Sequence, residues 1–170
     1  SVYSQNSNFL NWDFVSNSLS LDIKNKTLLS KGVLDIQVAD AYIIPENEQL
    51  YIKEDFQIQP LKNSVLVLDT ISEYHRFINS NVSVLTKDKF EGKGVYEYVN
   101  FDLDTFNIPF SQFEFKTTEN NQLTSFSTGD VSENNPILME PGFNFYGNIE
   151  LLANSEQLLF DGSIIPSEVI

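Results

Sequence analysis

The sequence of 170 residues contains no cysteine, which excludes both a disulfide framework and a thiolate metal site. It has a single histidine, so a metal site built from several histidines is excluded as well. No apolar run approaches the about 18 residues that a membrane-spanning helix needs. There is no Walker loop, no Rossmann glycine pattern and no basic patch, and hence no sequence signature for binding nucleotides or nucleic acids.

Basic residues are also scarce. Ten lysines and arginines stand against 24 aspartates and glutamates, which gives a formal net charge of −14. A field of this sign repels phosphate groups, so nucleic acids and anionic membrane surfaces are disfavoured as partners. The acidic residues are spread along the chain rather than gathered in a tail, which is typical of a solvated surface.

The residues that are abundant favour β-structure. Fourteen phenylalanines and seven tyrosines accompany many valines, isoleucines and threonines, all of which are enriched in strands. Turn residues separate short alternating segments, and this spacing predicts about twelve to fifteen strands. We therefore predict an all-β fold with little or no α-helix. The sheets are expected to form a β-solenoid-like array or stacked antiparallel layers, with a β-sandwich as the alternative.

Several segments carry local predictions. Residues 18–24 alternate apolar and polar side chains and predict a half-buried strand, followed by a two-residue turn at Asn25-Lys26. Residues 64–68 are largely apolar, which predicts a strand buried on both faces. The closely spaced Gly92 and Gly94 indicate a bulge or a tight bend.

Two further segments leave alternatives open. Residues 69–80 fit either a short helix or a strand or loop, and the β-branched and aromatic flanks favour strand or loop. Residues 101–115 alternate over a long stretch that Asn107 and Pro109 interrupt. We expect two strands there, because proline is rare inside a strand.

The stretch Gly32–Ile52 has a partial echo in residues 147–166. The echo suggests a repeated β unit, but the shared fragments occur in different orders, so a strict repeat is not predicted. Within the first stretch, Gly32 is expected to begin a strand that Pro45 ends. The side chains expected to be buried or tightly packed in it are those of Leu34, Ile36, Val38, Ala39 and Ala41.

A succession of short motifs runs from about Trp12 to Gly162. They are VADA with IP in residues 38–45, PLKN in 60–63, YHR in 74–76, GVYEY in 94–98, FNFYG in 143–147 and LFDG in 159–162. This succession resembles a segment of very large, uncharacterised secreted β-repeat proteins of gut-dwelling and gliding Gram-negative bacteria. The resemblance implies an extracytoplasmic location (periplasm, cell surface or secreted) and a longer parent chain, and it brings no activity or catalytic residue.

The resemblance also shapes the expected domain organisation. Residues 1–170 are expected to form a single all-β domain or a fragment of a longer β-repeat protein, with residues 1–8 flexible. The leading hypothesis for function is a non-enzymatic, structural or adhesion-like β module of a large exported protein. Its partners would be other domains of the same long chain or another protein at the cell surface.

Aromatic residues provide the alternative hypothesis, a carbohydrate-binding module. Rings that stack on sugars are expected among Trp12, Tyr42, Tyr51, Tyr96, Tyr98 and Tyr146. Tyr96 and Tyr98 would share one face of a strand and, with Trp12, are the candidate ligand-binding residues. The competing interpretation is an aromatic ladder that only stabilises the sheet.

Carboxylates provide the third hypothesis. Asp102 and Asp104 would point the same way on a strand, where a pair can bind Ca²⁺ or serve a glycoside hydrolase. A pair of surface carboxylates is the competing interpretation, and no other cofactor is expected. His75 is expected to be structural or exposed, because the sequence lacks the nucleophile turn of a hydrolase triad.

Overall fold

The computed structural model describes residues 2–3, 14–117 and 123–167, and these residues are organised almost entirely as strands. Fifteen strands and one 3₁₀ turn form the regular structure of the described ranges, and no α-helix occurs within them. The predicted all-β class and the predicted number of strands are thus confirmed. In this part of the chain, no helix has the length and apolar character needed to span a membrane.

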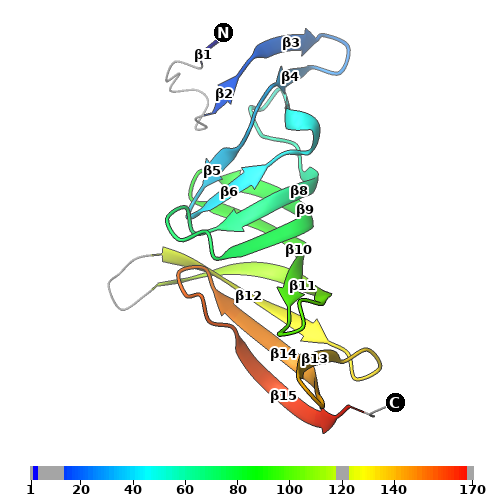
Figure 1. Cartoon of the computed structure of the whole chain (residues 1–170). Helices are drawn as coiled ribbons and strands as arrows, with labels where there is room; N and C mark the ends of the chain where they lie inside the picture. The colour runs from blue at the N-terminus through cyan, green and yellow to red at the C-terminus, as the bar shows by residue number, and fades with distance from the viewer. Residues whose placement is uncertain (1, 4–13, 118–122, 168–170) are drawn as a thin grey trace.

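A small sheet forms the N-terminal end of the molecule (Figure 1). Its three antiparallel strands have the order β3-β4-β7, with bounds Ser18–Asp22, Thr27–Lys31 and Gln49–Ile52. The 3₁₀ turn η1 (Glu46–Glu48) leads into β7. Next to this sheet, β1 (Val2–Tyr3) pairs with β2 (Val15–Ser16).

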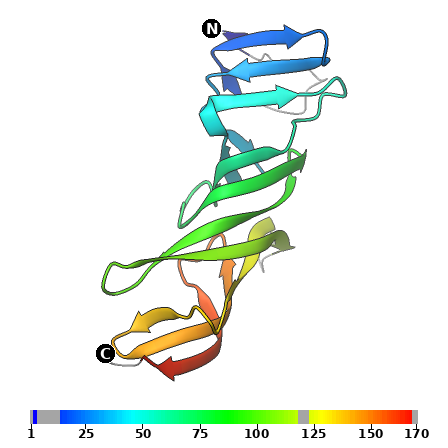
Figure 2. The same ribbon diagram turned by 90° about the vertical axis from the view of Figure 1, so that its right-hand side faces the viewer.

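The second sheet is large, antiparallel and ten-stranded, with the order β13-β14-β12-β11-β10-β9-β8-β6-β5 and with β15 also paired to β14. Its strands are β5 (Ile36–Val38), β6 (Ala41–Ile44), β8 (Leu61–Leu68), β9 (His75–Thr86), β10 (Lys89–Val99), β11 (Thr105–Thr117), β12 (Leu123–Val131), β13 (Ile137–Glu140), β14 (Phe143–Leu152) and β15 (Leu159–Pro166). Figure 2 shows the strands arranged one below another from the small sheet to the C-terminal end.

The large sheet coils strongly, so that strands distant in the pairing order meet. The turn between β5 and β6 reaches the start of β12, where the Ser125 N–H donates to Asp40 Oδ2 at 2.7 Å and the Ser125 hydroxyl donates to Oδ1. The Ala39 N–H also donates to the Lys87 carbonyl, in the turn between β9 and β10, at 2.8 Å. These bonds hold one end of the sheet against its middle.

The concave side of the coil is filled by a single hydrophobic core. Phe77 on β9 is fully buried at its centre. The Phe77 ring centroid lies 5.0 to 5.3 Å from those of Tyr96, Phe110 and Phe113. The centroids of Tyr96 and Phe110 lie 5.8 Å apart. Such tilted and edge-to-face pairs add to the hydrophobic burial of each ring. The same core continues to Ile149 and Leu151 on β14.

Two local predictions are confirmed. The pairing of β10 with β9 shifts register between Lys93 and Val95, so a bulge lies at Gly94 as the close glycines predict. A Cβ at Gly94 would lie 2.5 Å from Ser80 Oγ, which explains why a glycine is needed there. In β8 the consecutive side chains of residues 66–68 are buried, as a strand covered on both faces requires.

Residues 69–80 form a turn followed by the first half of β9, so they contain no helix, in agreement with the preferred strand or loop. The prediction of two strands in residues 101–115 is wrong, because Thr105–Thr117 is one continuous strand. Pro109 is tolerated there beside an irregularity, since the pairing of β11 with β12 shifts register just after it, between Phe110 and Gln112.

The predicted half-burial of residues 18–24 is also wrong. All five residues of β3 are exposed, because β3 is the outer strand of the small sheet and nothing in the described structure covers it. The turn that follows has four residues, 23–26, rather than two. The Asp22 carboxylate explains its length, because it accepts hydrogen bonds from the backbone N–H groups of Lys24 and Asn25.

In the stretch after Gly32, Ile36, Val38 and Ala41 are buried as predicted. The prediction of one strand up to Pro45 is wrong, because a turn at Ala39 and Asp40 divides it into β5 and β6, and Pro45 follows the end of β6. The prediction for Leu34 is wrong, since its side chain is 68% exposed. The strand begins at Ile36 rather than at Gly32. The echo also does not extend to local structure, because Gly32 lies before β5 whereas the corresponding Gly147 lies inside β14.

Candidate functional site

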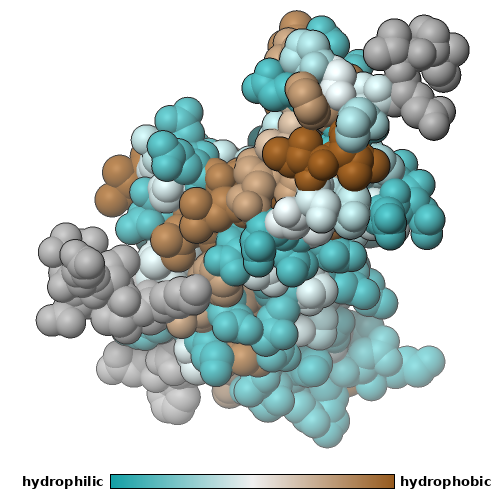
Figure 3. Space-filling model, turned by 90° about the horizontal axis from the view of Figure 1, so that it is seen from below, coloured by the Kyte–Doolittle hydropathy of each residue, from teal (hydrophilic) through white to brown (hydrophobic). Residues whose placement is uncertain are grey.

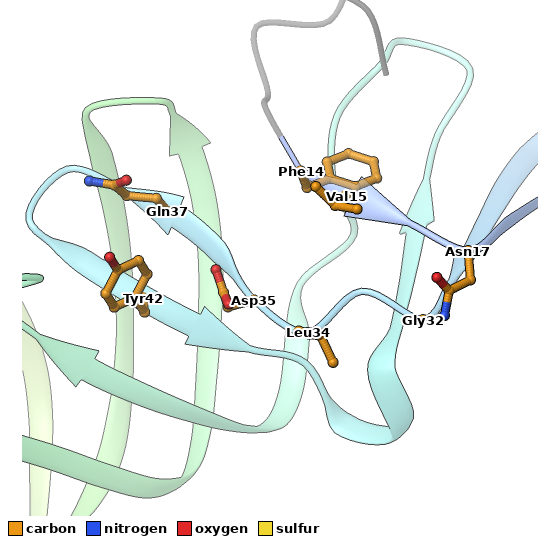
Figure 4. Close-up of a pocket in the computed structure, with 8 residues that line it drawn as sticks. All are labelled: Phe14, Val15, Asn17, Gly32, Leu34, Asp35, Gln37 and Tyr42. Carbon is orange, nitrogen blue, oxygen red and sulfur yellow. The ribbon is translucent and has the colours of Figure 1, made fainter. Parts of the chain in front are cut away.

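A groove lies between the small sheet and the first strands of the large sheet (Figure 4). We call it the inter-sheet groove, and it has a volume of about 630 Å³. Its lining residues are Phe14, Val15, Asn17, Gly32, Leu34, Asp35, Gln37 and Tyr42. Val15 belongs to β2 and Phe14 directly precedes it, whereas Gln37 and Tyr42 belong to β5 and β6 (Figure 4).

The backbone at Gly32 creates the groove. Gly32 has φ +70°, and a Cβ there would lie 2.3 Å from Asn17 Nδ2, so both the conformation and the close approach require glycine. The chain then turns Val33 into the core, where its N–H donates to the Glu48 carbonyl at 3.1 Å. Leu34 consequently points outward, and the segment between β4 and β5 forms the floor of the groove (Figure 4).

The polar side chains of the inter-sheet groove are available for a ligand. Gln37 and Tyr42 face each other as cross-strand partners on the outer face of the large sheet. Asp35 is exposed beside them, in the segment directly before β5 (Figure 4). A carboxylate, an amide and a phenol next to aromatic and aliphatic surface can bind a neutral polar molecule through hydrogen bonds and ring contacts.

A second, apolar depression lies at the far end of the small sheet and is called the distal groove. Its volume is about 430 Å³, and its lining residues are Leu21, Ile23, Lys26, Leu28, Ile52, Lys53, Glu54 and Phe56. An ion pair joins Lys26 Nζ to Glu54 Oε2 at 3.0 Å, and both side chains are mostly exposed. Such a pair contributes little to stability, so the notable property of this groove is its apolar surface.

A third candidate surface is β15, at the C-terminal end of the large sheet. Among the described strands it pairs only with β14, so its other edge carries backbone groups without a neighbouring strand. Seen from this end, apolar side chains gather in a band among polar ones (Figure 3). Large exposed apolar residues on β14 and β15 are Phe143, Leu159 and Ile164.

The structure places Tyr96 and Tyr98 against the core inside the coil. Tyr96 and Tyr98 share one face of β10, as their spacing requires, and both are half-buried against the core. Burial, and then the neighbouring Tyr98, raises the pKa of Tyr96. Burial, and then Glu140, raises the pKa of Tyr98. The Tyr98 ring is edge-on to Phe160 of β15, at 6.0 Å between centroids.

His75 lies beside Tyr96 and is buried. Its Nε2 is 2.6 Å from the Ser155 carbonyl, so Nε2 carries the proton, and the Tyr96 hydroxyl donates to Nδ1 at 3.2 Å. Burial lowers the pKa of His75, which favours this neutral form. Both ring nitrogens are therefore occupied by structural hydrogen bonds.

Asp102 and Asp104 lie in the turn between β10 and β11, not on a strand. Asn100 forms this turn, because its Oδ1 accepts from the N–H groups of Asp102 and Asp104 at 3.0 and 2.9 Å. The expected strand geometry of this pair is thus wrong. Over the described ranges, no group of three or more histidine, aspartate or glutamate side chains is arranged to hold a metal ion. Trp12 and most of residues 1–8 lie outside the described residues.

The inter-sheet groove contains functional candidates that the sequence alone does not single out. Asp35 and Gln37 look like the solvated positions of an ordinary strand, and only the approach of β2 gives them a common surface. A usable signal was Gly32, because a glycine directly after a strand indicates a backbone turn. Comparison of the chain with protein-family models, curated proteins and solved structures gives no match.

Proposed function

We propose that this chain is a non-enzymatic, structural or adhesion-like β module of a large exported protein. In this proposal its open ends pack against further β-structure, from other domains of the same long chain or from another protein at the cell surface. The observation that supports the proposal is a gradient of burial across each end of the fold. Core-facing side chains are buried in the inner strands and exposed in the outermost ones.

The small sheet has the clearest gradient. Leu50 and Ile52 on β7 are buried. Their cross-strand partners on β4 pair in turn with Leu19 and Leu21 on β3. These side chains lie on the same face of the sheet. Leu19 and Leu21 are nevertheless 42% and 68% exposed. The distal groove continues this uncovered face, and contiguous apolar surface of this kind marks interaction sites.

The proposal is tested by comparing this chain with a longer product of its natural coding sequence that includes the flanking residues. Hydrogen–deuterium exchange of both proteins should show slower exchange at β3 in the longer one, because a covering strand protects backbone amides. Strand β9, inside the large sheet, is the control and should not change. Equal exchange at β3 in both proteins, or a natural polypeptide no longer than this chain, would overturn the proposal.

The inter-sheet groove favours a second candidate function, carbohydrate binding. Its supporting observation is that Tyr42 lies beside Gln37 and Asp35 on one surface. A glycan array followed by calorimetry on the hits tests it. Tyr42→Ala should abolish binding, whereas Tyr51→Ala, which removes an exposed tyrosine outside the groove, should leave it unchanged.

A parallel variant separates this groove from the site predicted in the sequence. Loss of glycan binding in Tyr98→Ala with normal binding in Tyr42→Ala would assign the ligand to the Tyr96–Tyr98 surface instead. A folded chain with no glycan hit would contradict the second candidate and leave the structural module in place.

A further inference from the structure

The direction of the backbone groups on β15 follows from one hydrogen bond at its end. The Ser167 N–H donates to the Gly142 carbonyl at 2.8 Å, in the same register that pairs β14 with β15 without interruption. Hydrogen-bonded pairs alternate in an antiparallel ladder, so the odd-numbered residues of β15 bond to β14. The N–H and C=O groups of Phe160, Gly162 and Ile164 therefore point away from the sheet.

The pairing of β14 with β12 leads to the same assignment of odd and even residues. The Ala153 N–H donates to the Ser125 carbonyl at 2.8 Å, in the register of β14 with β12. Odd residues of β14 thus bond to β12 and even residues to β15. The free edge of β15 consequently offers three N–H donors two residues apart, and Pro166, which has no N–H, marks its end.

The side chains of β15 are arranged symmetrically about Gly162. On each side of this glycine, one polar residue is followed by two apolar ones: Asp161, Phe160 and Leu159 before it, and Ser163, Ile164 and Ile165 after it. A strand with such symmetry can pair with an antiparallel copy of itself so that residues of like character lie opposite each other. Self-complementary pairing of this kind generates a two-fold symmetric interface.

The core-facing side of β15 also ends uncovered. Phe160 and Ile164 are cross-strand partners of the buried Ile149 and Phe145, so they lie on the core side of the sheet. Phe160 is half-buried beside Phe145, with 5.2 Å between ring centroids, but Ile164 is 65% exposed. A strand added to this edge would bring an apolar side chain next to Ile164 and extend the core.

We propose that two copies of this chain associate through antiparallel pairing of their β15 strands about Gly162. Phe160 of one copy then lies opposite Ile164 of the other, Asp161 opposite Ser163, and Gly162 opposite itself. Three hydrogen-bonded pairs would supply about six backbone hydrogen bonds and join two sheets into one. This proposal rests on the proposed function, because it names the β-structure that covers one of the two open ends.

Pairing about Gly162 is favoured because the two adjacent registers each contain an unfavourable contact. A shift that centres the pairing on Asp161 places the two Asp161 carboxylates opposite each other, which is repulsive. A shift that centres it on Ser163 places Asp161 opposite Ile165 and sets Pro166, without a donor, opposite Phe160. Pairing about Gly162 avoids both faults.

Charge sets the conditions under which the pairing is strongest. Each copy carries a net charge of −14, so two copies repel each other. Salt screens this repulsion, since the Debye length falls from about 8 Å at 0.15 M salt as ionic strength rises. Dimerisation should therefore become tighter with added salt, whereas pairing with a basic strand from another protein would become weaker.

The test is sedimentation equilibrium of the full chain over a range of concentrations, at about 0.15 M and about 0.5 M sodium chloride. A species of twice the chain mass should form and increase with salt. Ile164→Pro removes an outward N–H but none of the bonds to β14, and Ile164→Lys places a charge at the edge. Each should weaken dimerisation at least about tenfold, while Ile71→Lys, at an exposed position in a distant turn, should not.

A cross-link tests the register. The chain has no cysteine, so the double variant D161C/S163C introduces its only thiols. Asp161 and Ser163 of opposite copies form a non-hydrogen-bonded pair, in which Cβ atoms are close enough for a disulfide. Mild oxidation should give a covalent dimer, and D161C alone should cross-link much more slowly.

Each outcome decides between the two proposals. A chain that stays monomeric at all concentrations and salts, or a dimer that Ile164→Pro and Ile164→Lys leave intact, overturns the β15 pairing. If the pairing is overturned but β15 is protected in the longer natural product, the proposed function stands, and β-structure other than a second copy covers β15. A β15 dimer without protection of β3 in the longer product would support the pairing and overturn the proposed function.

Discussion

Replacing Asp40 by alanine should loosen the coil of the large sheet. The Asp40 carboxylate accepts two hydrogen bonds from Ser125, whose backbone and side chain are buried at the start of β12. Hydrogen bonds to charged groups contribute about 1.5 to 3 kcal/mol each, and a buried donor left without a partner costs its desolvation. Because Asp40 is half-exposed, solvent reduces these contributions, and we expect Asp40→Ala to lower the free energy of unfolding by about 2 to 3 kcal/mol.

Urea unfolding followed by far-ultraviolet circular dichroism measures this loss. With a slope of about 1 to 3 kcal/mol per molar urea, the midpoint should fall by about 1 M or more. Asp22→Ala is the matched control, since Asp22 also accepts several hydrogen bonds, but only within its own exposed turn. A midpoint for Asp40→Ala equal to that of Asp22→Ala would refute the idea that this contact closes the coil.

Three further predictions concern the core and its titration. Phe77→Ala should destabilise the protein by about 3 to 5 kcal/mol in calorimetry, because it empties the centre of the aromatic cluster. Gly129→Ala should cost about 1 to 3 kcal/mol in the same assay, because its Cβ would lie 2.4 Å from the Phe110 ring; wild-type stability would disprove that packing. The pKa of His75 is lowered by burial, so its contribution to stability is complete above about pH 6.5 and falls as the pH drops toward the folded-state pKa. Urea midpoints measured at both ends of this window should show that His75→Gln lacks this loss, and an unchanged pH dependence would contradict it.

The sequence predicts those features that depend on neighbours along the chain. The apolar run of β8 and the bulge at Gly94 are confirmed, because local composition decides both. Residues 69–80 also follow the local preference for a strand. The continuous strand β11 was missed because its tolerance of Pro109 depends on the register of a neighbouring strand, which a single sequence does not show.

The burial of Val33 in place of Leu34 also depends on a contact that a single sequence does not show. Alternation of Leu34 with Ile36 and Val38 predicts one buried face, but the left-handed backbone at Gly32 interrupts the period before the strand begins. Gly32 also lies against the Asn17 side chain, which the pairing of β3 with β4 brings there. Because this contact is between strands, the inter-sheet groove and its residues Asp35 and Gln37 could not be predicted from the pattern.

Alternation also shows that a strand has an apolar face without showing what covers that face. Leu19 and Leu21 on β3 have the pattern of half-buried residues, and so does Phe160 with Ile164 on β15. In the inner strands the predicted cover is present, as at Ile52 and Ile149. At β3 and β15 the pattern is the same but the cover is missing from the described chain. Both strands are patterned for neighbours beyond the described residues, and for β15 the symmetry about Gly162 is the reason for proposing a second copy as that neighbour.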